Sequence, residues 1–278
     1  MDEISVKITS PNSDAITVGD NRPLLLIAGP CALESYELCA RVAEKMAEIC
    51  ERLGLSYVFK ASFDKANRTS LSSYRGPGLE EGLGALAKIR SQIGVPVVSD
   101  IHDFTQAKAA GEVLDIIQIP AFLCRQTDLL KAAAETGKPV SIKKGQFVSP
   151  WDMKNAVDKV RGGGGRNVML VERGASFGYN NLVVDMRSLP VMRSFGCPVI
   201  FDATHSVQLP GGAGGSSGGQ REFIEPLTKG AVAAGIDGLF MEVHPQPDKA
   251  LCDGPNSLAL DAVEQLLEKV VRIRNAVA

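Results

Sequence analysis

Residues 198–205 read PVIFDATH, a short apolar run that ends on an aspartate and a histidine. Seven other stretches follow the same plan, each rich in Val, Ile and Leu and each ending in polar residues. They are 24–31 (LLLIAGPC), 56–63 (SYVFKASF), 95–102 (VPVVSDIH), 116–121 (IIQIPA), 139–146 (PVSIKKGQ), 167–174 (NVMLVERG) and 238–245 (GLFMEVHP). Continuous apolar runs are typical of parallel strands covered on both faces, so the repeat predicts eight such strands.

The segments between these runs have the spacing of amphipathic helices. Leu38, Val42 and Met46 recur every four residues and would share one face of a helix, and residues 79–93 repeat their apolar positions in a similar way. Several segments stop on a glycine just before the next run, at Gly54, Gly94, Gly137, Gly196 and Gly235. Because glycine adopts the left-handed conformation that closes a helix, each of these marks a predicted helix end.

Eight strand–helix units in a chain of 278 residues predict an α/β fold, specifically a (β/α)8 TIM barrel that spans 1–278 as a single domain. Residues 1–20 precede the first unit, and we expect 4–18 to form a short N-terminal β-hairpin across the bottom of the barrel. A doubly wound open sheet is the alternative. That fold usually has fewer strands and often carries a Gly-x-Gly-x-x-Gly turn after the first one, which this sequence lacks.

Composition and charge exclude several classes of protein. The formal net charge is −2, so no overall basic field would attract nucleic acid or an anionic membrane. No apolar stretch reaches the roughly 18 residues of a membrane span, and the opening MDEISVKITS does not read as a signal peptide. Six cysteines without a CxxC pair indicate reduced thiols. We therefore expect a cytoplasmic protein with no nucleic-acid and no membrane partner.

Polar side chains gather at the predicted strand ends. In a barrel the carboxyl ends of the strands share one face, and that face carries the active site. The side chains there are Cys31, Lys60, Asp100, His102, Gln118, Lys143, Lys144, Arg173, Asp202, His205, Glu242 and His244. Burying so many charges is costly unless a partner or a ligand meets them, so we interpret this face as a binding site.

The cationic members of this set, extended by two residues of nearby loops, predict an anion site. They are Lys60, Lys65, Arg125, Lys143, Lys144 and Arg173. Lysine and arginine in a cleft suit phosphate and carboxylate groups. Salt bridges to acidic residues of the same rim are the alternative. For Lys144 and Arg125 the two interpretations have equal weight, and for the other cations we favour ligand binding.

A second group combines a thiol, an imidazole and carboxylates in Cys31, His205, Glu242 and Asp253. A closed barrel puts its eighth strand beside its first, so these residues become neighbours. Such donors fit Zn²⁺, Fe²⁺ or Mn²⁺. Two alternatives stay open at this point: Cys31 is a nucleophile with His205 as its base, or Cys31 is a packed and inert thiol.

Two glycine-rich tracts connect predicted elements. RGGGGR at 161–166 falls between a helix and a strand, and we expect a flexible connection on the bottom face. LPGGAGGSSGGQRE at 209–222 follows a strand and therefore lies on the top face. We expect this second tract to be a lid over the site, with a flexible linker as the alternative.

Longer motifs run through nearly the whole chain. They are GPCALES (29–35), FKASFDKANRTS (59–70), SYRGPGLEEG (73–82), IIQIPAFLCRQTDLL (116–130), KKGQFVSP (143–150), RGASFGYNNLVVDM (173–186), FDATHSVQ (201–208) and CDGPN (252–256). In these motifs the sequence resembles the 3-deoxy-D-manno-octulosonate 8-phosphate synthases, a family of (β/α)8 barrels. The resemblance implies a transferase that condenses phosphoenolpyruvate with D-arabinose 5-phosphate and water, releasing inorganic phosphate, in lipopolysaccharide synthesis. It also implies a homo-oligomer, usually a homotetramer.

The same resemblance implies roles for individual residues. Phosphoenolpyruvate would be held by Lys65, Lys143 and Arg173, with Lys60 close by and Gln118 and Ala121 lining its pocket. The pentose phosphate would be held by Asn67, Arg68 and Thr69, and its hydroxyl groups by Asp100. In this family the Asn-Arg loop serves the site of a neighbouring subunit. Catalytic roles are implied for Lys65 and, in proton movement, for His205 and Asp253.

The family has a branch that uses a metal and a branch that does not. The metal branch has Cys at the Gly-Pro turn and the other branch has Asn, so Cys31 implies a metal site completed by His205, Glu242 and Asp253. KKGQF also resembles the metal branch. The CDGP around Asp253 departs from this pattern, because it is more similar to the metal-free branch.

Three other activities remain as alternatives. A sister synthase uses erythrose 4-phosphate and typically has Lys-Pro-Arg-Thr where this chain has KANRTS, so Asn67 is the discriminating residue. A Schiff-base aldolase barrel would use Lys143 or Lys60 as its nucleophile. A sugar-phosphate binding barrel without catalysis is the third, and no strand-end residue favours it.

Overall fold

The computed structural model describes residues 4–20, 22–212 and 217–277. Within these residues, eight parallel strands close into a barrel, because β11 pairs with both β8 and β14 and β14 also pairs with β3. The strands are β3 Leu25–Gly29, β4 Ser56–Lys60, β5 Val97–Asp100, β6 Ile116–Ile119, β7 Val140–Lys143, β8 Val168–Glu172, β11 Val199–Asp202 and β14 Gly238–His244. This closure confirms the predicted (β/α)8 barrel and excludes the open sheet.

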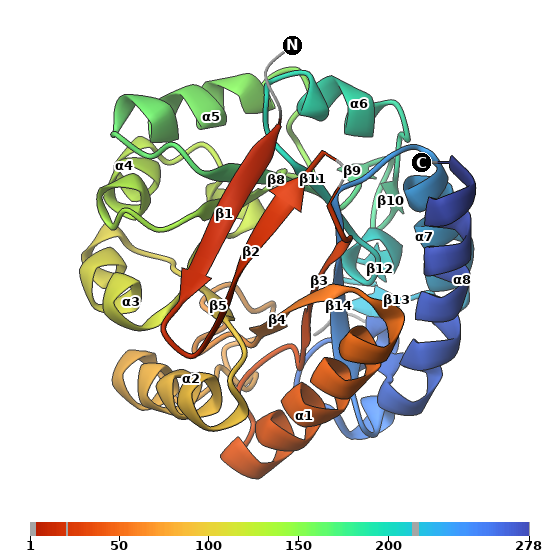
Figure 1. Ribbon diagram of the computed structural model, residues 1–278, viewed down its shortest axis with the longest axis horizontal. Helices are drawn as coiled ribbons and strands as arrows, with labels where there is room; N and C mark the ends of the chain where they lie inside the picture. The colour runs from red at the N-terminus through yellow and green to blue at the C-terminus, as the bar shows by residue number, and fades with distance from the viewer. Residues whose placement is uncertain (1–3, 21, 213–216, 278) are drawn as a thin grey trace.

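A ring of helices surrounds the barrel (Figure 1). They are α1 Tyr36–Leu53, α2 Leu79–Ile93, α3 Ala107–Val113, α4 Thr127–Glu135, α5 Met153–Gly162, α6 Ser188–Arg193, α7 Ile224–Ala233 and α8 Val263–Val277. Val42 and Met46 of α1 are buried, as their spacing predicts. Each of the five glycines predicted to end a helix has a positive φ, between 66° and 91°.

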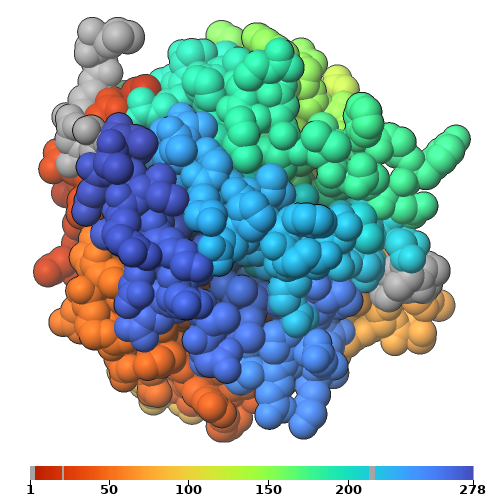
Figure 2. Space-filling view, turned by 90° about the vertical axis from the view of Figure 1, so that its right-hand side faces the viewer, coloured from red at the N-terminus to blue at the C-terminus, as the bar shows by residue number. Residues whose placement is uncertain are grey.

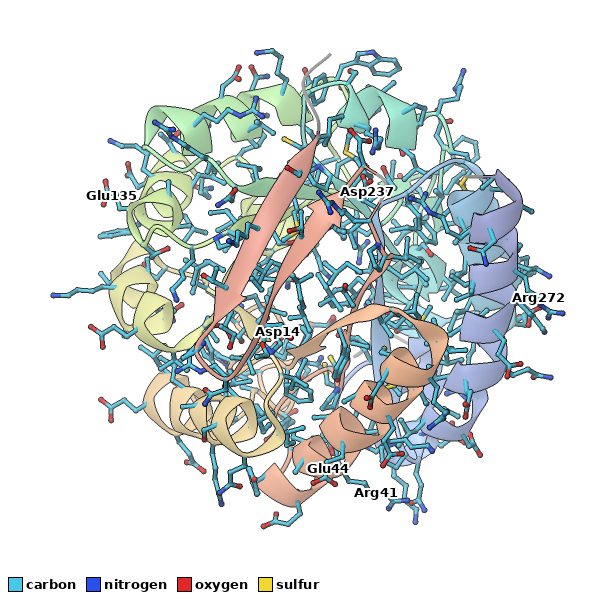
Figure 3. All side chains as sticks on the ribbon, in the orientation of Figure 1. Asp14, Arg41, Glu44, Glu135, Asp237 and Arg272 are labelled. Carbon is cyan, nitrogen blue, oxygen red and sulfur yellow. The ribbon has the colours of Figure 1, made fainter. Side chains whose placement is uncertain are left out.

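Charged side chains point outward from this ring. Figure 3 shows Arg41 and Glu44 on α1, Glu135 on α4 and Arg272 on α8, all on the outer surface of the molecule. Figure 2 shows α8, in dark blue, beside the orange segment near the start of the chain. There Arg52 of α1 donates to Glu264 of α8 at 3.1 Å. The first and last helices of the chain thus close the outer ring.

An antiparallel hairpin of β1 Ser5–Ser10 and β2 Ser13–Gly19 lies across one end of the barrel (Figure 1). Its buried side chains Val6, Ile8 and Val18 pack on the inward-facing residues of the barrel strands, such as Leu25 and Ile27. The hairpin therefore seals the end opposite the strand carboxyl termini, as the sequence predicts.

Short elements complete the chain. Three small strand pairings involve β9 Ala175–Ser176 with β10 Leu182–Val183, β12 Gln208–Leu209 with β13 Gly218–Gly219, and β15 Leu258–Ala259 with β14. The 3-10 turns are Phe104–Gln106, Ala121–Leu123, His205–Val207, Arg221–Phe223, Pro247–Lys249, Gly254–Asn256 and Leu260–Ala262. Among the described residues, no helix has the length and apolar character needed to span a membrane.

Candidate active site at the mouth of the barrel

A cavity of about 1130 Å³ opens at the carboxyl ends of the strands. Most of the residues predicted for the site line it: Lys60, Lys65, Asn67, Arg68, Thr69, Asp100, Gln118, Ala121, Lys143, Arg173, His205 and Asp253. The two remaining predicted residues, Cys31 and Glu242, are 3% and 0% exposed and contact the lining residues from below. The structure therefore brings the whole predicted set together.

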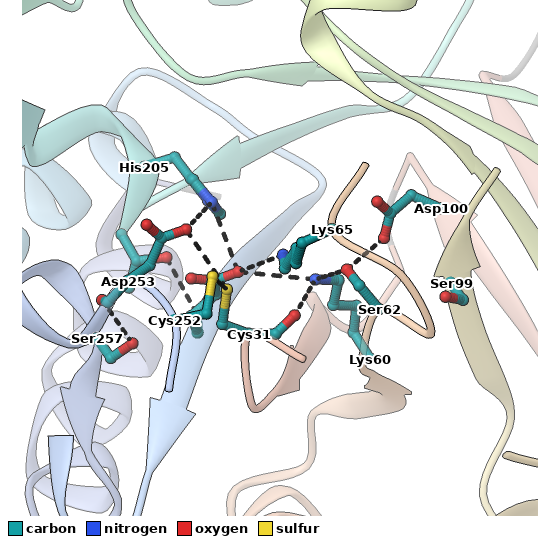
Figure 4. Close-up of polar contacts among 12 residues, drawn as sticks. Cys31, Lys60, Ser62, Lys65, Ser99, Asp100, His205, Cys252, Asp253 and Ser257 are labelled. Carbon is teal, nitrogen blue, oxygen red and sulfur yellow. Dashed lines mark hydrogen bonds and ion pairs between the residues drawn. The ribbon is translucent and has the colours of Figure 1, made fainter. Parts of the chain in front are cut away.

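Lys60 is the first member of a chain of hydrogen bonds on one side of the cavity (Figure 4). Its Nζ donates to Ser62 Oγ at 3.0 Å and to the carbonyl oxygen of Cys31 at 3.2 Å. Ser62 in turn donates to Asp100, whose Oδ2 lies 2.9 Å from His102 Nε2. Burial raises the pKa of Asp100, but the bond to His102 and the charge of Lys60 outweigh it and hold that pKa well below its ordinary value. Asp100 is thus held as a carboxylate acceptor.

Asp202 joins the cationic side of the cavity to the imidazole. Its Oδ2 lies 2.6 Å from Lys143 Nζ and 2.8 Å from His205 Nδ1, and its Oδ1 accepts from the backbone N–H of His205 at 2.9 Å. Burial raises the pKa of Asp202, yet the charges of His205 and Lys143 lower it overall. This carboxylate orients the ring so that Nε2 faces Glu242 at 3.5 Å and Asp253 at 3.9 Å.

Glu242 has the least satisfied carboxylate in the site. It is fully buried at the end of β14, and neither of its carboxylate oxygens has a hydrogen-bond partner among the described residues. Its contacts are ion pairs with Lys60 and Lys65, each at 3.6 Å, and with His205. Burial raises the pKa of Glu242, but these positive charges lower it to about 2. An anionic, unsatisfied carboxylate at this depth fits a position beside a bound cation.

The donor atoms near Glu242 form two overlapping groups that could hold an ion (Figure 4). His205, Glu242 and Asp253 form one, and Cys31, Cys252 and Asp253 form the other, with the atoms of each group within 4.8 Å of one another. Cys31 Sγ lies 3.4 Å from Asp253 Oδ2 and 2.8 Å from Cys252 Sγ. Cys31 is therefore part of a polar cluster and is not packed among aliphatic side chains alone.

The sequence interpretation gave no role to Asp202, Ser62 or Cys252. The sequence places Asp202 only at a polar strand end, and its one signal for Cys252 is the position next to Asp253. Asp253 itself has a φ of 49°, in the left-handed region that an aspartate tolerates better than most residues. With this backbone, the side chains of Cys252 and Asp253 both lie in the same cluster.

Lys144 and Arg125, for which the sequence left ligand binding and salt bridges equally open, are not among the residues that line the cavity. Lys144 is 2% exposed, and its Nζ lies 3.5 Å from Glu172 Oε1 and 3.2 Å from the carbonyl oxygen of Gly174. Lys144 therefore follows the salt-bridge alternative. Arg125 is exposed. Of the predicted lid at 209–222, Pro210, Gly211 and Ser217 line the cavity, and residues 213–216 lie outside the described residues.

A closed barrel whose mouth combines buried cations with a thiol, an imidazole and carboxylates defines an enzyme that handles small anionic molecules.

Residues 3–278 match the family described as DAHP synthetase I. Proteins named 2-dehydro-3-deoxyphosphooctonate aldolase are similar over nearly their full length. The one from Desulfotalea psychrophila is 73% identical over 98% of this chain and 97% of its own. The one from Syntrophotalea carbinolica is 64% identical, over 93% of both chains. The one from Synechococcus is 57% identical over 99% of this chain and 96% of its own. The chain belongs to the DAHP synthetase I family, in agreement with the resemblance found in its motifs.

Proposed function

We propose that this enzyme condenses phosphoenolpyruvate with D-arabinose 5-phosphate and water to give 3-deoxy-D-manno-octulosonate 8-phosphate and inorganic phosphate. The observation that carries the proposal is the convergence of Lys60, Lys65, Lys143 and Arg173 on one cavity. The Nη1 of Arg173 is buried and has no hydrogen-bond partner among the described residues. An unpaired guanidinium nitrogen beside lysines suits a ligand with phosphate and carboxylate groups. Relatives that are 57–73% identical carry the corresponding name.

The two substrates would occupy different parts of the cavity. Phosphoenolpyruvate is assigned to Lys65, Lys143 and Arg173, with Gln118 and Ala121 lining its pocket. The pentose phosphate is assigned to the loop that carries Asn67, Arg68 and Thr69, and its hydroxyl groups to Asp100. The resemblance implies that the Asn-Arg loop serves a neighbouring subunit's site, whereas in this single chain all of these residues line the same cavity. Within that cavity both ligands would lie within reach of one another.

The protein's own groups account for binding, orientation and proton movement. C3 of phosphoenolpyruvate attacks the aldehyde carbon, positive charge develops at C2, water adds there, and phosphate leaves with cleavage of the C–O bond. The lysines and Arg173 hold the phosphate in place and stabilise it as it leaves. Asp202 keeps the His205 ring oriented, and His205 and Asp253 are the groups placed to move protons.

A divalent ion fits the donor atoms below this cavity. Cys31, His205, Glu242 and Asp253 would hold Zn²⁺, Fe²⁺ or Mn²⁺, and the unsatisfied carboxylate of Glu242 supports this choice. When bound, such an ion supplies a Lewis acid that can polarise the aldehyde oxygen or position the water.

We also propose that the enzyme is a cytoplasmic homotetramer. Large aromatic side chains are exposed on loops and turns near the mouth, at Phe122, Phe147, Trp151, Phe177 and Tyr179. Exposed large apolar side chains support a contact between subunits. Sedimentation equilibrium measures the assembly, and a monomer at working concentration contradicts it.

A phosphate-release assay with both sugars tests the reaction. We expect inorganic phosphate from phosphoenolpyruvate when arabinose 5-phosphate is present, and much less with erythrose 4-phosphate. Turnover with erythrose 4-phosphate alone would identify the sister activity. A borohydride-trapped adduct on Lys143 or Lys60 would identify a Schiff-base aldolase instead.

A further inference from the structure

Cys252 is a second buried thiol beside the predicted metal ligands. It is 2% exposed, and its Sγ lies 2.8 Å from the Sγ of Cys31, 221 residues away in the sequence. Both cysteines are free. The contact exists because β14 pairs with β3, which brings the loop after the last barrel strand next to the Gly-Pro turn after the first.

The backbone around Cys252 directs its side chain into the cluster. In an extended chain neighbouring side chains point to opposite sides, but Cys252 and Asp253 both line the cavity. The left-handed φ of 49° at Asp253 and the 3-10 turn Gly254–Asn256 that follows produce this convergence. The turn requires glycine at position 254, because a Cβ there would lie 2.4 Å from the carbonyl oxygen of Pro247.

The sulfur of Cys252 lies among other polar groups of the cluster. Arg68 donates a guanidinium N–H to its Sγ. Cys31, Cys252 and Asp253 by themselves form a group of three donors close enough to share one ion. Two sulfurs and a carboxylate make a softer donor set than a single sulfur does, which favours Zn²⁺ or Fe²⁺ over Mn²⁺.

We propose that Cys252 is a second thiolate ligand of the metal site, so that the ion in this chain binds both Cys31 and Cys252. The proposal rests on the metal site assigned under the proposed function. Two sulfurs that each bind one ion at about 2.3 Å would lie further apart than the present 2.8 Å, so the two side chains would separate when the ion binds.

The direct test counts sulfur atoms around the metal in the wild-type protein. X-ray absorption at the zinc edge, on protein loaded with Zn²⁺ under reducing conditions, should show two sulfur neighbours at about 2.3 Å. One sulfur neighbour overturns the proposal. This measurement needs no variant and no activity.

Spectroscopy with Co²⁺ assigns the sulfurs to residues. The thiolate-to-cobalt absorption of the wild type should fall by about half in Cys252→Ser and by about half in Cys31→Ser. Cys197→Ser is the matched control, because Cys197 is also buried but contacts Arg161 and Phe195 outside the site, and its spectrum should be unchanged. Full intensity in a folded Cys252→Ser variant overturns the proposal.

The two proposals can fail separately. If reduced wild-type protein releases phosphate with arabinose 5-phosphate but binds neither Zn²⁺ nor Co²⁺, the catalytic assignment stands and the thiolate pair is rejected. If it binds Co²⁺ with two thiolates but turns over neither sugar, the thiolate pair stands and the catalytic assignment is rejected.

Discussion

Asp202 is a charged side chain of this site that contacts two functional residues at once. Its carboxylate contacts both Lys143 and His205, which are assigned different tasks in the reaction. Removing its charge therefore affects the orientation of an imidazole and the partner of a buried lysine together. Sequence alone could not show this, because the choice of partner depends on side-chain distances across β7 and β11.

For Asp202→Asn we expect kcat to fall by about 10²-fold, since the amide no longer stabilises a protonated imidazole or a buried ammonium. Steady-state kinetics with both substrates measures this. Asp158→Asn is the control, because Asp158 pairs with Lys154 on the exposed face of α5 and should leave kcat unchanged. An Asp202→Asn enzyme with wild-type kcat contradicts the role given to this carboxylate.

Glu242 predicts how the free energy of unfolding depends on pH. Burial raises its pKa, but the neighbouring cations lower it from 4.5 to about 2. A carboxylate whose pKa is depressed in the folded state stabilises the protein fully above its unfolded value, and this contribution is lost as the pH falls through its folded value. We expect the free energy of unfolding of the metal-free protein to decrease as the pH falls from about 4.5 to about 2.

Urea titrations at several pH values measure that decrease. In Glu242→Gln the corresponding part of the pH profile should become shallower, because the titrating group is gone. The same slope in the variant and in the wild type would show that other carboxylates produce the effect.

At the scale of elements, the ends of β7 and β8 carry charges on both of their faces. Lys143 and Arg173 line the cavity, while Lys144 and Glu172 form a buried pair on the opposite side. Glu172 also accepts from the backbone N–H of Gly174 at 2.6 Å. The pair thus joins the two strand ends and fixes the segments from which the cavity cations project. Strand alternation alone could have predicted the direction of Lys144, since adjacent residues point to opposite faces.

Lys144→Met tests this arrangement. Leaving Glu172 buried without its partner should destabilise the protein by about 3–5 kcal/mol. We expect KM for phosphoenolpyruvate to rise about 10-fold while KM for arabinose 5-phosphate changes little, because the affected strands carry Lys143 and Arg173.

The double variant Lys144→Met with Glu172→Gln is the control for stability. It should recover much of the lost free energy of unfolding, since it leaves no unpaired buried charge and the amide oxygen can still accept from the backbone N–H of Gly174. An equal rise in both KM values in either variant would indicate a general loss of structure rather than displaced cations.

At the scale of the whole molecule, closure of the barrel creates the site. The sequence was sufficient to predict the strands, the helix-ending glycines and the meeting of the first and eighth strands, because apolar periodicity and chain order determine them. It was not sufficient for Cys252, whose position depends on the unusual backbone of Asp253. The site therefore follows from topology, and its detailed contacts follow from local geometry.

Because the metal donors come from β14 and from the segments after β3, β11 and β14, an ion would connect parts of the chain that are far apart in sequence. A ligand that binds only the folded state stabilises it, by about 2.7 kcal/mol at a concentration 100 times its Kd. Treatment with a chelator should therefore lower the melting temperature and reduce the rate of phosphate release together. Adding back Zn²⁺, Fe²⁺ or Mn²⁺ in separate samples should restore both, and scanning calorimetry with the phosphate assay measures them.

In Cys31→Asn the fold should persist while the shift in melting temperature on adding metal becomes smaller, because one ligand is lost. If the chelator changes neither quantity in the wild type, the closure of the barrel brings these donors together without a metal, and the buried carboxylate of Glu242 depends on Lys60, Lys65 and His205 for its charge balance.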